Sequence, residues 1–318
     1  MEFKSITLLF PGQGSQYTGM GRSLEGKKSF NLIPYSDKIL GYELSKLMLE
    51  GPEDQLNLTE NTQPAIVTHS LALLEELNNF LKNKPIKIRT CLGHSVGEYS
   101  ALVACGTLSS EDAIKAVHHR GKFMQKAVPL GKGKMVAILK VPEEIIKKAC
   151  QESSTKEEQA MPANFNEPNQ IVISGHAGAT DRVVQWLEEN HKEPFRSVPL
   201  KVSAPFHSSL MAPAAQQLKE YFKNLNFNPS KIDYLANIDS KKYPVETPGE
   251  VIQNNLINQV EGSVLWTQSF QKIPEDSLCL EVGPSKILTG LGRKINRSIK
   301  ILPLDSDNAF SKLEELLS

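Results

Sequence analysis

The stretch IKIRTCLGHSVGEYSALVA, residues 86–104, decides how this chain folds. Residues 86–92 form a run typical of a buried strand, and a helical pattern follows the glycines to about Ala104. Between the two lies Gly93-His94-Ser95-Val96-Gly97, a G-x-S-x-G sequence. A strand, a sharp glycine-flanked turn and a helix form a nucleophile elbow, which lifts a serine above the edge of a sheet. The stretch therefore predicts an α/β fold with Ser95 as its candidate nucleophile.

Strands and helices alternate on both sides of this turn. An apolar run over 5–10 predicts a first strand, which breaks at Pro11-Gly12-Gln13-Gly14. Ser109 and Asp112 have the spacing of a helix N-cap, and that helix should run to about Ala127. Strands are also expected at 234–237 and 278–282, and helices at 61–77, 212–223, 251–259 and from Pro284 to about Lys294. This alternation predicts a mostly parallel sheet with helices on both faces.

The segment 129–200 has a different pattern. Strands are expected at 135–139, 170–174 and 195–200, with helices at 142–151 and 177–190. The spacing fits a β-α-β-β-α-β unit and predicts an inserted, ferredoxin-like α+β subdomain. We therefore expect a discontinuous large domain, 1–128 and 201–318, and a small subdomain, 129–200.

Composition narrows the classes of function. The chain has 36 Lys+Arg and 36 Asp+Glu, which argues against a nucleic-acid binder that works by bulk charge. No apolar run approaches the roughly 18 residues of a membrane span, and the N-terminal residues do not resemble a signal peptide. The scattered Cys91, Cys105, Cys150 and Cys279 lack zinc-ligand spacing. We expect reduced thiols, no bound metal and a cytoplasmic protein without membrane or nucleic-acid partners.

A serine nucleophile needs a base, and seven histidines are available. His207 lies in a loop directly after a predicted strand, where reactive side chains are often found, so it is the favoured base. His94 neighbours Ser95 in sequence, but an elbow usually points that side chain away from the serine. The others are expected to cap helices or face solvent: His69, His118, His119, His176 and His191.

Arg120 is a charged residue on a face that should be buried. Its helix has an apolar stripe through Ala113, Val117, Met124 and Ala127, and Arg120 falls within that stripe. A buried charge needs a partner. Either an internal carboxylate or the carboxylate of a ligand would suit the arginine fork, and periodicity leaves both open.

The turn Gly12-Gln13-Gly14 admits two interpretations. A backbone N–H in this turn, together with that of Val96 at a helix N-terminus, would form an oxyanion hole. A dinucleotide-binding loop is the rival interpretation. It fits poorly, because Tyr17 stands where that motif requires a third glycine.

Seven motifs are spread over nearly the whole chain. They are Pro11-Gly12-Gln13-Gly14-Ser15-Gln16, Thr62-Gln63-Pro64-Ala65, Gly93-His94-Ser95-Val96-Gly97-Glu98-Tyr99, Arg120-Gly121-Lys122-Phe123-Met124-Gln125, Asn164-Phe165-Asn166, Pro205-Phe206-His207-Ser208-Ser209-Leu210-Met211 and Glu281-Val282-Gly283-Pro284. In type and order these motifs resemble those of the malonyl-CoA:acyl carrier protein transacylase family. The resemblance implies an α/β-hydrolase-like large domain with the inserted subdomain. It also implies ping-pong transfer of a malonyl group from malonyl-CoA to the phosphopantetheine thiol of acyl carrier protein, in fatty acid biosynthesis.

The resemblance also assigns roles to single residues. Ser95 matches the nucleophile, His207 the base and Arg120 the ligand of the malonyl carboxylate. The backbone N–H groups of Gln13 and Val96 match the oxyanion hole. The remaining matches are the backbone carbonyl of Gln259, which orients the histidine, Gln63 near the pocket, and Phe206, which resembles malonyl-selective relatives. No cofactor beyond the substrates is implied, and we expect a monomer.

Alternatives stay open on the sequence alone. A stand-alone malonyl-specific acyltransferase serving a polyketide synthase shares the same motifs. A serine esterase or thioesterase shares Ser95 and His207 but does not need Arg120, and a non-catalytic scaffold would not need Ser95. The lysine- and arginine-rich segments 120–150 and 282–304 are either a docking surface for an acidic carrier protein or solvated helix faces.

Overall fold

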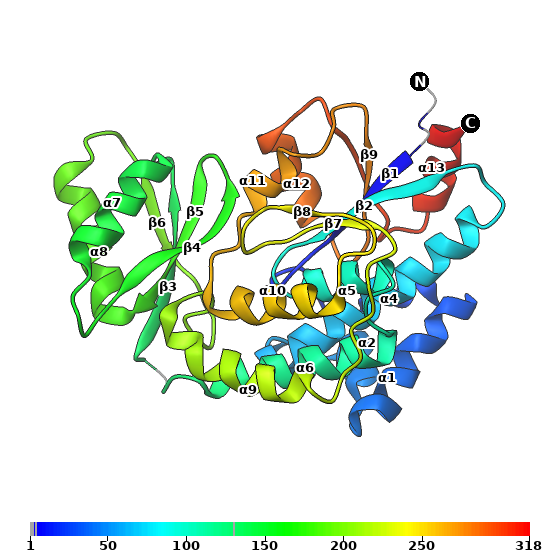
Figure 1. Cartoon of the computed structure of the whole chain (residues 1–318), viewed down its shortest axis with the longest axis horizontal. Helices are drawn as coiled ribbons and strands as arrows, with labels where there is room; N and C mark the ends of the chain where they lie inside the picture. Colours follow the sequence, from blue (N-terminus) through cyan, green and yellow to red (C-terminus); the bar gives the residue numbers. More distant parts are fainter. Residues whose placement is uncertain (1–2, 4, 130) are drawn as a thin grey trace.

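Two β-sheets organise the chain, each with its own hydrophobic core (Figure 1). The computed structural model describes residue 3 and residues 5–129 and 131–318. The larger sheet has six strands in the order β10-β9-β1-β2-β7-β8, and the smaller has four in the order β4-β5-β3-β6. The fold class expected from the sequence, α/β with a mostly parallel sheet and an α+β subdomain, is confirmed.

The larger sheet is parallel except at one edge. Its parallel strands are β1 (Ser5–Phe10), β2 (Lys87–Gly93), β7 (Asp233–Leu235), β9 (Leu278–Glu281) and β10 (Lys300–Pro303). The short β8 (Lys242–Tyr243) pairs antiparallel to β7. The carboxyl ends of β1 and β2 therefore meet at one edge of the sheet, and the elbow with Ser95 begins there.

Helices cover both faces of this sheet, as the apolar runs in its strands require. Ile6, Leu8 and Phe10 of β1 join the core formed with the helices α4, α5, α6, α9, α10 and α13. Leu9 and Leu92 point to the other face and pack with α11 and α12. The helices of this part are α1 (Leu32–Leu40), α2 (Leu44–Glu50), α3 (Glu53–Leu56), α4 (Thr59–Leu81), α5 (Gly97–Ala104), α6 (Ser110–Lys126), α9 (Ala212–Phe222), α10 (Gly249–Glu261), α11 (Trp266–Phe270), α12 (Ile287–Ile295) and α13 (Ala309–Leu317).

The smaller sheet follows the order expected of a ferredoxin-like unit. Its elements are β3 (Gly133–Leu139), α7 (Glu143–Ser153), β4 (Ala160–Glu167), β5 (Gln170–His176), α8 (Ala177–Asn190) and β6 (Arg196–Pro199). All neighbouring strands are antiparallel, and α7 and α8 bury one face of the sheet. Its four strands all lie within the range 129–200, and the strands of the larger sheet all lie outside it.

The two parts meet along β4. The backbone N–H of Phe165 donates to the carbonyl of Val264 at 2.9 Å, and Val264 donates to Ala163 at 2.8 Å. Lys294 pairs with the nearly buried Glu167 at 3.2 Å. A strand that belongs to the small sheet is thus fastened to the large domain, which fixes the position of its side chains relative to Ser95.

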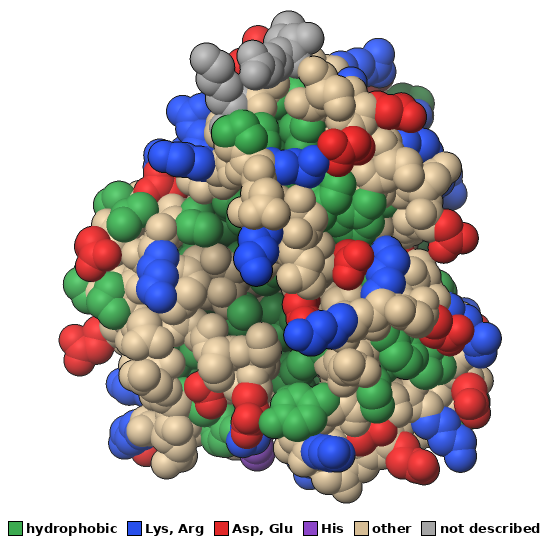
Figure 2. Space-filling model, turned by 90° about the vertical axis from the view of Figure 1, so that its right-hand side faces the viewer, with side chains coloured by type: hydrophobic (Ala, Val, Ile, Leu, Met, Phe, Trp, Pro, Cys, Tyr) green, Lys and Arg blue, Asp and Glu red, His purple; other side chains and the backbone are tan. Residues whose placement is uncertain are grey.

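The face farthest from the small sheet carries basic and acidic side chains interspersed with one another (Figure 2). It presents no broad field of a single sign, in keeping with the zero net charge of the chain. Within the described residues, no helix is both long and apolar enough to cross a membrane.

Candidate active site

The strand–turn–helix around Ser95 is the predicted elbow. Ser95 has φ = 50°, a left-handed conformation that is uncommon outside glycine. The two flanking glycines permit the close packing. A Cβ at Gly97 would overlap the carbonyl oxygen of Phe10, and one at Gly93 would overlap the backbone of Gly97. The first turn of α5 therefore lies directly against β1 and the end of β2.

Asn237, which follows β7, holds this turn in place. Its Oδ1 accepts from the backbone N–H of Ser95 at 2.7 Å, and its Nδ2 donates to the carbonyl of Gly93 at 2.6 Å. The Asn237 side chain thus accepts one hydrogen bond and donates another, and the two together offset the strain of a left-handed serine, which is typically about 1–3 kcal/mol.

His207 contacts the candidate nucleophile. Its Nε2 lies 2.7 Å from the Ser95 Oγ, and its Nδ1 lies 2.8 Å from the carbonyl of Gln259 and 3.1 Å from that of Gly262. Carbonyl oxygens only accept, so Nδ1 carries the proton and Nε2 accepts from the serine hydroxyl. Burial, together with the nearby Arg120 cation, lowers the pKa of His207 to about 3. The imidazole is therefore neutral at pH 7 and able to take a proton.

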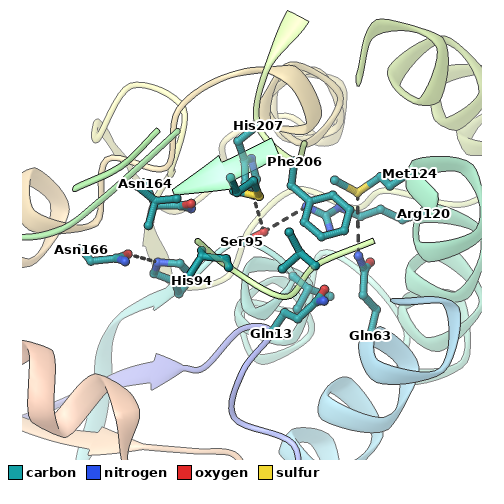
Figure 3. Close-up of a pocket in the computed structure, with 15 residues that line it drawn as sticks. Gln13, Gln63, His94, Ser95, Arg120, Met124, Asn164, Asn166, Phe206 and His207 are labelled. Atoms are coloured by element: carbon teal, nitrogen blue, oxygen red, sulfur yellow. Dashed lines mark hydrogen bonds between the residues drawn. The ribbon is translucent and has the colours of Figure 1, made fainter. Parts of the chain in front are cut away.

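Arg120 lies fully inside the molecule, as its place in the apolar stripe predicts. Its Nη2 donates to the Ser95 Oγ at 3.1 Å (Figure 3). The same Nη2 donates to the side-chain oxygen of Gln259 at 3.0 Å. The sequence left open whether an internal or a ligand carboxylate pairs this cation. Within the described residues no carboxylate makes an ion pair with it, and its Nε has no hydrogen-bond partner. The guanidinium thus retains donor capacity next to the nucleophile.

The backbone N–H groups of Val96 and Gln13 are the candidates for an oxyanion hole. Val96 is the N-cap of α5, where the helix dipole favours negative charge, and Gln13 lies in the turn after β1. Neither N–H donates a hydrogen bond to any group in the described part of the chain. Both residues line the pocket that contains Ser95 and His207.

The pocket has a volume of about 150 Å³ and lies between the two parts of the molecule (Figure 3). The small sheet contributes Met135, Asn164, Asn166 and Val172, and the large domain contributes the polar groups described above. Apolar side chains dominate the rest of the lining: Met124, Leu200, Val202 and Phe206. Gln63 also lines the pocket, as expected, with its Nε2 against the Met124 sulfur at 3.8 Å.

His94 points away from the Ser95 hydroxyl, as expected from the geometry of an elbow. Its Nε2 lies 2.8 Å from the Asn166 Oδ1, and its ring packs against Trp266 with centroids 5.6 Å apart. The side chain before the nucleophile therefore links the elbow to β4.

Sequence reasoning missed Glu98 and Asn237. Glu98 is buried, and its Oε2 accepts from the Gln259 Nε2 at 2.6 Å and from the backbone N–H of Asn237 at 3.3 Å. Burial raises the pKa of Glu98 to about 7. A signal for Glu98 was present, since it is a charged residue within the otherwise uncharged run 90–104, the same kind of anomaly as Arg120. Asn237 had no such signal, because it is a polar residue in a loop after β7, far from Ser95 in sequence.

The arrangement suits nucleophilic chemistry by a serine hydroxyl. Among the residues that the structure describes, no group of histidine, cysteine, aspartate or glutamate side chains is placed to hold a metal ion. All four cysteines are buried and unpaired.

Comparisons with known proteins agree with one another. A family model described as an acyl transferase domain matches residues 7–299. The malonyl CoA-acyl carrier protein transacylase of Haemophilus influenzae is 38% identical over 318 residues, 99% of each chain. The crystal structure of an acyl carrier protein S-malonyltransferase from Vibrio cholerae superposes with a TM-score of 0.90 at 35% identity, over 98% of this chain and 99% of that one. A malonyl-transacylase in complex with its type II PKS acyl-carrier protein gives a TM-score of 0.88 at 34% identity, again over 98% and 99%.

Proposed function

This chain belongs to the family of acyl transferase domains, and we propose from that premise that Ser95 carries a malonyl group from malonyl-CoA to an acyl carrier protein. The activity is that of a malonyl CoA-acyl carrier protein transacylase, the name of a relative that matches it over 99% of both chains. The contact of Ser95 with both His207 and Arg120 carries the proposal. It places next to one hydroxyl both a base and a cation that can bind a substrate carboxylate.

In the first half-reaction the Ser95 Oγ attacks the thioester carbonyl of malonyl-CoA while His207 Nε2 takes the hydroxyl proton. The N–H groups of Gln13 and Val96 bind the negative oxygen of the tetrahedral intermediate. The carbon–sulfur bond then breaks, and coenzyme A leaves as a thiol with the proton from His207. A malonyl ester on Ser95 remains.

The second half-reaction runs the same steps with a different thiol. His207 takes the proton of the phosphopantetheine thiol of the carrier protein, and the sulfur attacks the ester carbonyl. When the carbon–oxygen bond breaks, Ser95 recovers its proton from His207, and malonyl carrier protein is released. The carbonyl of Gln259 keeps the His207 Nδ1 proton in place throughout, so the imidazole always offers Nε2 to the reacting atoms.

Arg120 selects the acyl group. A malonyl carboxylate offers two acceptor oxygens to the guanidinium fork, whereas an acetyl group leaves the buried donors unpaired. Binding at Arg120 also holds the thioester carbonyl next to Ser95. The chain's own geometry thus provides a reason for a preference that neither an esterase nor a scaffold requires.

We place the transfer in fatty acid biosynthesis and in the cytoplasm, where the four unpaired thiols would remain reduced. A polyketide carrier protein is the alternative acceptor, and the similar malonyl-transacylase that was solved with its type II PKS carrier protein supports keeping it in view. Rates of malonyl transfer to a panel of fatty-acid and polyketide carrier proteins decide between the two.

The test is the acyl-enzyme itself. After mixing with malonyl-CoA, intact-protein mass spectrometry should show one added malonyl group on the wild type and none on Ser95→Ala. The group should leave Ser95 when phosphopantetheinylated carrier protein is added, with malonyl carrier protein as the product. Release of free malonate at the same rate with and without carrier protein would instead identify a thioesterase.

A further inference from the structure

Glu98 is a buried carboxylate that the reaction described above does not use. It lies in the first turn of α5, three residues after the nucleophile, and is 1% exposed. Its Oε2 accepts two hydrogen bonds, from the Gln259 side chain and the Asn237 backbone. Its Oε1 is buried and has no hydrogen-bond partner among the described residues. A carboxylate left half satisfied next to an active site needs a physical explanation.

Gln259 connects this carboxylate to the site. Its Nε2 donates to Glu98 at 2.6 Å and to the carbonyl of Ser95 at 3.0 Å, while its Oε1 accepts from Arg120 at 3.0 Å. Its backbone carbonyl accepts from His207. A single amide therefore bridges the Glu98 carboxylate and the Arg120 guanidinium, and its orientation is fixed because each end has a partner of the opposite type.

The charges around Glu98 leave Arg120 as its counter-ion. The titratable groups that face Glu98 are Arg120 on α6, Tyr99 on α5, Tyr234 on β7, Tyr243 on β8 and Asp239 between those strands. Burial raises the pKa of each tyrosine, so all three are neutral near pH 7. Asp239 pairs with Lys241 at 3.4 Å. Arg120 is the one lysine or arginine that is buried in the described part of the chain.

We propose that Glu98 is a positioning residue for the substrate carboxylate. Through Gln259 it aims the Arg120 guanidinium at the pocket, and its negative charge competes with the malonyl carboxylate for that guanidinium. Binding of the malonyl group is consequently linked to protonation of Glu98. The inference rests on the proposed function, because the competing carboxylate is that of the malonyl group.

The linkage follows from two anions sharing one buried cation. When the malonyl carboxylate binds Arg120, a second negative charge enters a desolvated site, and an ionised Glu98 then costs more free energy. Glu98 relieves that cost by taking a proton from solvent, and the unpartnered Oε1 is where the proton would sit. If malonyl binding raises the proton affinity of Glu98 by some factor, thermodynamic reciprocity requires that protonation of Glu98 strengthens malonyl binding by the same factor.

The experiment compares malonyl-CoA with acetyl-CoA across pH. We expect the ratio of kcat/KM for enzyme acylation, malonyl over acetyl, to fall by on the order of five-fold or more as the pH rises from about 6 to about 9. Burial raises the pKa of Glu98 to about 7, within this window, whereas the pKa of His207 is lowered to about 3, outside it. Both thioesters contain coenzyme A, so titration of its phosphate cancels in the ratio.

Glu98→Gln should remove the pH dependence of the ratio, because the amide keeps the shape of the side chain but does not ionise. Glu281→Gln is the matched control. Glu281 is also a fully buried glutamate with a raised pKa, but its carboxylate accepts from Leu288 and Thr289 on α12. In Glu281→Gln the malonyl-to-acetyl ratio of kcat/KM should fall with rising pH as it does in the wild type. The inference is wrong if this ratio does not change with pH in the wild type, or if it falls in Glu98→Gln as it does in the wild type.

A second variant covers the case in which Glu98→Gln does not fold. Gln259→Met removes the bridging amide but keeps the backbone carbonyl that holds His207, so malonyl loading should fall more than acetyl loading. An equal fall for both thioesters would overturn the positioning role. The proposed function has a separate outcome, since it fails if wild-type Ser95 gains no malonyl group at any pH. A malonylated enzyme without the pH effect refutes only the role of Glu98.

Discussion

Ser95 and His207 share an unusual property, because both adopt left-handed backbone conformations, with φ of 50° and 56°. Such conformations cost about 1–3 kcal/mol each in non-glycine residues and persist only where the surroundings fix them. Here Asn237 fixes the serine backbone, and two carbonyls fix the imidazole. These backbone conformations direct both side chains into the same pocket, where the imidazole can contact the serine hydroxyl.

Removing the proposed base, His207, should slow both half-reactions. We expect His207→Ala to reduce acylation by malonyl-CoA and transfer to carrier protein by roughly 10²–10⁴, the usual range for a lost general base. Rapid-quench measurement of labelled enzyme separates the two steps. Acylation of the variant at the wild-type rate would mean that another group is the base, and His94→Ala would be the next variant to measure.

The lowered pKa of His207 also predicts a pH dependence of stability. The imidazole has an ordinary pKa near 6.5 in the unfolded chain, but in the folded state burial lowers it to about 3. Between these values the unfolded state binds more protons, so stability is lost as the pH falls below about 6.5. Urea unfolding at about pH 7 and about pH 5 should show a smaller loss for His207→Gln than for the wild type. Equal losses would place the responsible proton elsewhere.

Arg120→Ala should alter substrate preference rather than abolish acylation. Leaving the buried malonyl carboxylate unpaired costs on the order of 2–5 kcal/mol, or roughly 30- to several-thousand-fold in kcat/KM for malonyl-CoA. Acetyl-CoA has no carboxylate and should not suffer that loss. Arg120→Lys should restore only part of the malonyl-CoA activity, because an ammonium group cannot donate the two parallel hydrogen bonds that a guanidinium gives a carboxylate. If both thioesters lose the same factor, Arg120 has a structural role instead.

The residues of the site differ in how far the sequence predicted them. Ser95 came from a local motif and Arg120 from a break in helical periodicity, both of which a single segment reveals. Gln259 came only from the resemblance to a family, because a backbone carbonyl has no sequence signal. Glu98 and Asn237 act through hydrogen bonds between segments 139 and 161 positions apart, and no local pattern encodes such a contact.

The junction of β1, β2 and α5 has very little free space. Gly97→Ala would usually favour a helix, but here the new Cβ would overlap the carbonyl of Phe10, so we expect a loss of about 1–3 kcal/mol in the free energy of unfolding. Gly290→Ala is the control. Gly290 lies inside α12 with open space around its Cβ position, and its substitution should stabilise by about 0.4–1 kcal/mol. Denaturant unfolding measures both, and stabilisation by Gly97→Ala would contradict the close packing.

Elements with a strong apolar pattern were predicted nearly to the residue. The strand over 5–10 is present with those bounds, and the helix predicted from the Ser109 cap begins at Ser110, where the Ser109 Oγ accepts from the N–H of Asp112 at 3.0 Å. The strand β4 was missed. It contains Pro162 and polar residues, and its pairing with β5 shifts register twice, so it has neither alternation nor an apolar run. Several short elements were also not predicted, because each gains its stability from packing against the rest of the fold. They are α1–α3, α11, α13, β8 and β10.

The pocket exists only because the large domain and the small sheet meet. Each part contributes side chains to its wall, and β4 joins them through backbone hydrogen bonds to Val264. If a carrier protein is the acceptor, as proposed, its phosphopantetheine arm has to enter this pocket to reach Ser95. Exposed residues beside the pocket are therefore candidates to guide a carrier protein, in addition to the basic segments 120–150 and 282–304, in which Lys134, Lys147, Lys148 and Lys294 pair with carboxylates.

Lys201 is exposed between Leu200 and Val202, two residues that line the pocket. Lys201→Glu should raise KM for an acidic carrier protein several-fold, because an exposed charge at an interface acts mainly on encounter. Transfer to free pantetheine, an uncharged thiol, should not change. Salt should weaken carrier transfer in the same selective way, since a Debye length of about 8 Å at physiological ionic strength screens exposed charges. Lys148→Glu is the control, because Lys148 pairs with Glu152 on α7, on the outer side of the small sheet (Figure 1). If Lys148→Glu has the same effect as Lys201→Glu, or if pantetheine transfer falls with carrier transfer, the carrier protein docks on another face.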